Sequence, residues 1–124
     1  MIIPVGSADP VGLQRLIRGL PELRELRPEL DLVVVVNRVR KTVVPGDPHR
    51  EVAAALARYA GVTDLTVVPY DRSALDAALA SGRTLSEVAP RSPARTAIAG
   101  LAARLAGIPE TPGRRHRRPR RAAG

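Results

Sequence analysis

Hydrophobic residues along the chain fall into short runs separated by longer amphipathic segments. The segment 31–37, DLVVVVN, contains four consecutive valines with no polar alternation. A β-branched run without alternation is typical of a parallel strand that is covered on both faces. Two shorter apolar runs, at 2–5 and 65–68, predict two further strands. The pattern therefore predicts a parallel sheet in which the strand at 31–37 is central.

Helical periodicity fills the intervals between these strands. Apolar residues in 11–20 recur at three- and four-residue spacing, so one face of that helix is apolar. The predicted helix starts share a capping Asp or Ser, which Pro follows in three cases: Asp9-Pro10, Asp47-Pro48, Asp71 and Ser92-Pro93. The order strand, helix, strand, helix, strand, helix, helix predicts right-handed βαβ crossovers and a three-layer α/β fold.

The sequence predicts one α/β domain at residues 1–107 and a disordered basic tail at residues 108–124. Pro, Gly and Arg dominate this tail, so it cannot bury enough apolar surface to offset the entropy of ordering it. Its arginines are Arg114, Arg115, Arg117, Arg118, Arg120 and Arg121. Three roles stay open for them: a nonspecific solubilising tail, a contact with nucleic-acid phosphates, or a contact with an anionic membrane surface.

Composition excludes several classes of function. The 124 residues carry a net charge of +8 and contain no Cys, so disulfides and thiolate metal sites are excluded. With no Phe or Trp and only two Tyr, the composition suits base-stacking aromatic modules badly. The longest apolar run, Leu32 to Val36, is far shorter than the ~20 residues that span a bilayer. The first residues also lack the basic flank and apolar core of a signal peptide. We expect a cytoplasmic protein without a membrane span.

Parallel sheets bind ligands beyond the carboxyl ends of their strands. The residues at those predicted ends are Gly6 and Ser7, then Asn37 and Arg38, then Pro69, Tyr70 and Asp71. Taken alone, Asn37 ends a strand and Asp71 caps a helix. Arg38, Arg40 and Lys41 form a basic loop, which either contacts phosphate or nucleic acid or is a solvated surface loop.

Four segments carry a family resemblance: VGSADPVGLQRL, DLVVVVNRVR, LTVVPYDRSALDAALASGRTL and SPARTAIAGLAARL. In order and spacing they resemble the later half of MinD/ParA-type (CpaE-like) ATPase domains, a group of P-loop NTPases, over residues 2–107. The resemblance implies a partial three-layer P-loop NTPase-type fold with a remnant adenine pocket. In that pocket the Asn37 amide hydrogen-bonds the base edge. The implied cofactor-binding residues are Asn37, Arg38, Pro69, Tyr70 and Asp71.

The phosphate-binding motif of that family is missing from the chain. The motif G-x-x-x-x-G-K-S/T needs glycines, whose N–H groups close on phosphates, and a lysine. The single lysine here, Lys41, follows Arg40 instead of glycine. The acidic Mg²⁺ ligand and the water-positioning switch segment of the family are missing too.

The resemblance therefore implies a truncated relative of the cell-division and chromosome-partitioning ATPases that is not catalytic alone. ATP would bind only if a separate N-terminal part completed the site. That part, or a second copy of the chain, would pair with an exposed edge of the sheet. The alternative is a small basic adaptor protein that contacts nucleic acid or an anionic membrane through its Arg-rich tail.

Overall fold

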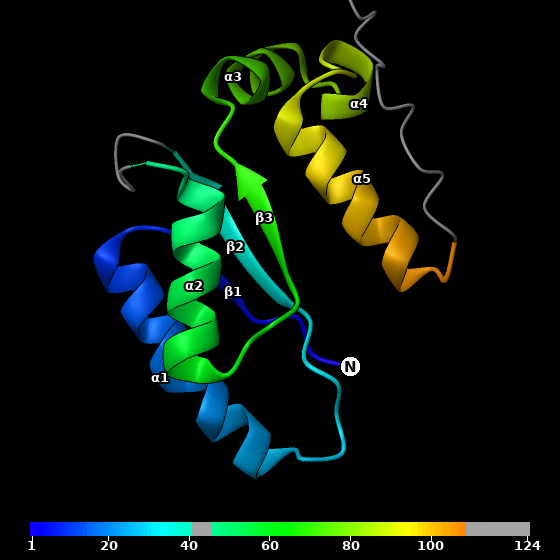
Figure 1. Cartoon of the computed structure of the whole chain (residues 1–124). Coiled ribbons are helices and arrows are strands. Elements are labelled where there is room, and N and C mark those ends of the chain that lie inside the picture. Colours follow the sequence, from blue (N-terminus) through cyan, green and yellow to red (C-terminus); the bar gives the residue numbers. More distant parts are fainter. Residues whose placement is uncertain (41–45, 109–124) are drawn as a thin grey trace, which may run out of the picture.

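The computed structural model describes residues 1–40 and 46–108, which form three strands and five helices (Figure 1). The strands are β1 (Val5–Ser7), β2 (Val34–Val39) and β3 (Leu65–Pro69). The helices are α1 (Pro10–Leu26), α2 (Pro48–Ala60), α3 (Arg72–Ser81), α4 (Leu85–Val88) and α5 (Pro93–Leu105). The chain is an α/β protein with a small parallel sheet, which confirms the predicted α/β class and parallel strands. The P-loop NTPase-type relation stays a prediction.

Strand β2 lies at the centre of the sheet, because the strand order is β1-β2-β3 and both neighbours run parallel to it. Val34, Val35 and Val36 expose 2%, 5% and 0% of their surface. Val34 and Val36 pack with α1 and α2, while Val35 packs with α5. The valine run is therefore buried on both faces, as its lack of alternation predicts.

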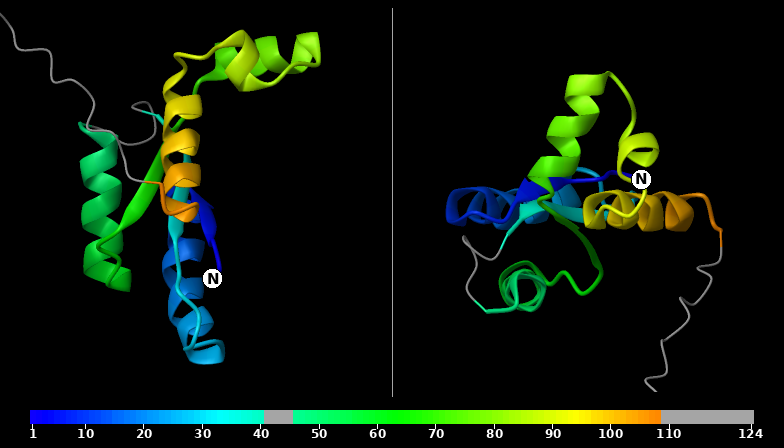
Figure 2. Two further views of the ribbon diagram at one scale, coloured as in Figure 1. Left: turned by 90° about the vertical axis from the view of Figure 1, so that its right-hand side faces the viewer. Right: turned by 90° about the horizontal axis from the view of Figure 1, so that it is seen from above.

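Helices cover the two faces of the sheet unequally. In Figures 1 and 2, α1 and α5 lie on opposite sides of the strands, and α2 lies near α1. The larger core, under α1 and α2, includes the fully buried Leu20, Val52 and Leu56. The smaller core, under α5, joins Val35 and Val68 to Ala94. The result is a helix–sheet–helix arrangement whose main core lies on the α1 and α2 face.

Four of the helices begin at the caps that the sequence predicts. These caps are Asp9, Asp47, Asp71 and Ser92, and each side chain accepts a backbone N–H of the first turn. Helices α2 and α3 end at Gly61 and Gly82, both in the left-handed conformation that favours glycine. The short helix α4, with a capping box of Thr84 and Glu87, is not among the predicted elements.

Strands β1 and β3 are the edges of the sheet within the described residues, because each pairs with β2 alone. Ile3, just before β1, is 39% exposed, and Val5 of β1 is 60% exposed. Val5 is in register with Val35 and so lies on the α5 face of the sheet. Within the described residues this edge of the sheet is apolar and unpaired. An N-terminal part or a second copy of the chain could pair with such an edge, and that pairing stays a prediction.

No helix in the described ranges is both long enough and apolar enough to cross a membrane. The predicted tail lies outside the described residues from residue 109 onward, with all of its arginines. Its predicted contacts with nucleic acid or a membrane surface therefore stay predictions. Lys41 of the basic loop lies outside the described residues as well.

Candidate functional site

The end of β2 departs from regular strand geometry. Val36 pairs with Val67 and Val39 with Pro69, so β2 has one more residue than β3 between these pairs. Such a bulge re-aims the side chains next to it. Inside the bulge, Arg38 has a φ of 58°, a backbone conformation that costs a residue with a Cβ roughly 1–2 kcal/mol. The carboxyl end of the central strand is therefore strained.

Hydrogen bonds hold this bulge between its neighbours. The Oδ1 atom of Asn37 accepts the N–H of Arg38 at 2.8 Å, and the N–H of Tyr70 donates to the carbonyl of Val39 at 2.9 Å. On the other side, Asn37 is in register with Ser7 of β1. The bond to Arg38 uses one lone pair of Asn37, and no hydrogen bond within residues 1–40 and 46–108 uses its two amide donors.

An apolar cavity of about 310 Å³ lies between the end of β2 and helices α3 and α5. Its polar lining residues are Asn37, Arg38, Tyr70 and Asp76, and Pro69 lines it as well. The aliphatic walls are Val68, Leu75, Leu79, Ala94 and Ile98. Leu79 is 81% exposed. Four of the five sequence-predicted cofactor-binding residues thus line one cavity.

Asp71, the fifth predicted residue, does not line the apolar cavity. Its Oδ1 atom accepts the N–H of Ala74 and the hydroxyl of Ser73, both at 3.3 Å. The Ser92 hydroxyl, followed by the N–H of Ala74, holds the pKa of Asp71 below its usual value. Asp71 lines a separate cavity beside Ser92. The structure therefore places it as the cap of α3, the role that its local sequence indicates.

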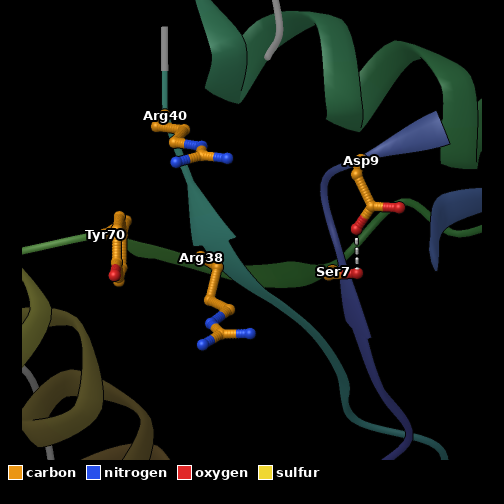
Figure 3. Close-up of a pocket in the computed structure, with 5 residues that line it drawn as sticks. All are labelled: Ser7, Asp9, Arg38, Arg40 and Tyr70. Carbon is orange, nitrogen blue, oxygen red and sulfur yellow. Dashed lines mark hydrogen bonds between the residues drawn. The ribbon is translucent and has the colours of Figure 1, made fainter. Parts of the chain in front are cut away.

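A polar cavity of about 310 Å³ adjoins the apolar one, and Arg38 and Tyr70 line both. The other residues of the polar cavity are Ser7, Asp9 and Arg40 (Figure 3). The guanidinium carbons of Arg38 and Arg40 lie 5.9 and 5.8 Å from the centre of the Tyr70 ring, within cation–π range. Figure 3 shows both guanidinium groups between Tyr70 and the Ser7–Asp9 side.

Asp9 closes the far side of the polar cavity. Its carboxylate accepts the Ser7 hydroxyl and, at 2.9 Å, the N–H of Gly12. These two bonds, the Ser7 hydroxyl first, lower the pKa of Asp9, so its carboxylate is ionised at neutral pH. A Cβ at Gly12 would lie 1.9 Å from the Ser7 hydroxyl oxygen, so only glycine fits there. The polar cavity thus combines two guanidinium groups and one carboxylate.

Parallel sheets bind ligands at the carboxyl ends of their strands, and this rule identifies Ser7 from the sequence. The rule and the family resemblance together identify Asn37 and the segment 69–71. Neither identifies the stacking of Arg40 on Tyr70 or the aliphatic walls of the apolar cavity. Leu75 and Leu79, four residues apart on one helix face, are the signal that would have found those walls. Nothing in residues 1–40 and 46–108 groups three or more His, Asp or Glu side chains as a metal site requires.

Comparison with known proteins does not place the chain in a family. No family model matches it, and a search of curated proteins finds no matching relative. The relation to MinD/ParA-type ATPases therefore stays a prediction from the sequence segments.

Proposed function

We propose that the chain binds an adenine nucleotide with the base in the apolar cavity and does not hydrolyse it by itself. One observation carries this proposal: Asn37, Arg38, Pro69 and Tyr70, which the sequence singles out as base contacts, line one cavity with aliphatic walls. A purine matches such a cavity, because it presents flat apolar faces and a polar edge. On this proposal the chain is related to the cell-division and chromosome-partitioning ATPases and keeps the base end of their site.

Asn37 supplies the polar contact in this proposal. Its side-chain amide carries both donors and an acceptor, which match the ring nitrogen and exocyclic amine on the adenine edge. The bond from the Arg38 N–H to Oδ1 restrains the amide before a ligand arrives, which lowers the entropy cost of binding. Bound adenine would cover Leu79 and Ile98, which are 81% and 50% exposed, and would remove their apolar surface from water.

The groups that make ATP hydrolysis fast are not part of this sequence. P-loop enzymes hold the β- and γ-phosphates with a glycine-lysine loop and a bound Mg²⁺, and the chain contains no such glycine-lysine motif. Phosphate and metal contacts supply much of the affinity in those enzymes. We therefore expect ATP to bind no tighter than roughly millimolar, about −4 kcal/mol, without turnover.

The test is an NMR titration of adenosine into the full chain. We expect amide shifts to cluster at residues 37–38, 69–70 and 75–79. The change Asn37→Ala should weaken binding about fivefold, because it removes one hydrogen-bonding group of the site. The matched control is Gln14→Ala, which removes an exposed amide on α1 and should leave the affinity unchanged.

Two results would contradict the proposal. One is a set of adenosine-induced shifts that lies outside the apolar cavity and does not respond to Asn37→Ala. The other is ATPase activity that survives rigorous purification and disappears in Asn37→Ala, since the chain would then be catalytic. The adaptor alternative depends on the tail, which lies outside the described residues, and no observation in the described part favours it.

A further inference from the structure

The polar cavity, lined by Ser7, Asp9, Arg38, Arg40 and Tyr70, indicates a second binding site next to the proposed base site. Its side chains come from the carboxyl ends of all three strands. Ser7 ends β1 and Asp9 follows it, Arg38 and Arg40 lie at the end of β2, and Tyr70 follows β3. The parallel topology brings these ends to one edge of the sheet, which is where such folds bind ligands.

Two guanidinium groups near a single tyrosine ring place two positive charges close together, which favours binding of an anion. The guanidinium carbons of Arg38 and Arg40 lie 5.9 and 5.8 Å from the centre of that ring. Figure 3 shows both groups on the side of Tyr70 that faces Ser7 and Asp9, where their like charges repel each other. None of the ion pairs among the described residues involves either arginine. Guanidinium groups present planar N–H donors that match a phosphate bidentately. A phosphate between them would relieve the repulsion and use these donors.

We propose that the polar cavity binds the phosphate of a nucleoside monophosphate whose base occupies the apolar cavity. This inference rests on the proposed base site and adds the class of nucleotide. The link between the two cavities is geometric, because Arg38 and Tyr70 line both. A ligand with a base and a phosphate can therefore place its base in the apolar cavity and its phosphate in the polar cavity, with Arg38 and Tyr70 beside the link between them.

The charge of the polar cavity selects one phosphate group over three. Two guanidinium groups and the Asp9 carboxylate leave one net positive charge among the described lining residues. A single phosphate ester carries about −1.5 to −2 charges at neutral pH, so these arginines suffice to bind it. Each further phosphate would bring more negative charge toward Asp9 without meeting another cation of that lining. We therefore expect adenosine triphosphate to bind no tighter than adenosine monophosphate (AMP).

The experiment compares adenosine, AMP, ATP and inorganic phosphate by calorimetric and NMR titration of the full chain at low salt. AMP should bind about tenfold tighter than adenosine, the gain from a charge-assisted hydrogen bond or two at a partly solvated site. The change Arg40→Ala should bring the affinity for AMP down toward that for adenosine. Arg40→Lys, which keeps the charge but loses the planar fork, should retain part of the gain.

Two matched variants control for charge alone. Arg58→Ala removes an arginine that stacks 5.2 Å over Tyr59, outside both cavities. Arg118→Ala removes one arginine of the tail. Both should leave the AMP-to-adenosine ratio unchanged, and a thermal melt of each variant confirms that it is folded.

The outcomes separate this inference from the base site. Equal affinities for adenosine and AMP would overturn the phosphate site and leave the base site standing. An AMP gain that Arg118→Ala removes and Arg40→Ala does not would place the phosphate on the tail, which also overturns it. Conversely, Arg40-dependent binding of AMP and inorganic phosphate without adenosine binding would support the phosphate site and overturn the base site.

Discussion

The two halves of β2 follow different rules. Val34, Val35 and Val36 form regular strand and are at most 5% exposed, and Val35 and Val36 are paired with both neighbouring strands. Two residues later the strand bulges, and Arg38 adopts a positive φ that a residue with a Cβ rarely takes. The first half stabilises the sheet, whereas the second half holds Asn37 and Arg38 at the cavities at a cost in stability. Strain of this kind concentrates at functional sites.

The largest expected effect comes from the regular half. Val36→Ala removes two methyl groups from a fully buried position, and we expect the free energy of unfolding to fall by about 2 kcal/mol. Val5→Ala makes the same change on β1 at a position that is 60% exposed and should cost no more than about 0.5 kcal/mol. Urea denaturation of both variants measures the difference. Equal losses would show that the centre of the sheet is not its main source of stability.

A substitution at Arg38, in the irregular half of β2, should raise the free energy of unfolding rather than lower it. Arg38→Gly relieves the positive φ and should raise the free energy of unfolding by about 0.5–1 kcal/mol, after the entropy cost of glycine. Arg38→Ala removes the same side chain but keeps the Cβ, so it should give no such gain. Both variants should weaken AMP binding. If urea denaturation shows that Arg38→Gly destabilises the chain, the bulge is not strained in the way described.

The smallest expected effect is a pH dependence at the edge of the polar cavity. The Ser7 hydroxyl and the Gly12 N–H lower the pKa of Asp9 from 3.8. The stability that this carboxylate contributes is therefore present above pH 3.8 and is lost as the pH falls through the lower pKa of the folded state. Asp9→Asn keeps a capping oxygen but does not titrate. Its acid unfolding curve should be shallower than that of the parent chain, and identical curves would contradict the assignment.

The regular half of β2 could be predicted from sequence, because burial on both faces requires an unbroken apolar run. The caps could be predicted for a similar reason, since Asp9 followed by Pro10 satisfies helix-start chemistry locally. The positive φ of Arg38 could not, because the pairing of β2 with two neighbours sets it and no glycine marks the position. Helix α4, with four residues, is too short to show a period.

The candidate site was predictable only in part, because part of it depends on how distant segments of the chain pack together. The carboxyl-end rule depends on topology, and it placed Ser7, Asn37 and Tyr70 at one edge. The apolar cavity also depends on how α3 and α5 pack beyond that edge, which no local pattern fixes. Asp71 shows the limit, because its position after β3 fits the base pocket while its hydrogen bonds commit it to capping α3.

A crystal structure of the full chain grown with saturating AMP tests the central claim most directly. That claim is that the irregular end of β2 forms a nucleotide site. We expect the adenine beside Asn37, covered by Leu79 and Ile98, and the phosphate between Arg38 and Arg40. AMP bound only at other surfaces, with both cavities free of it at saturation, would contradict the account.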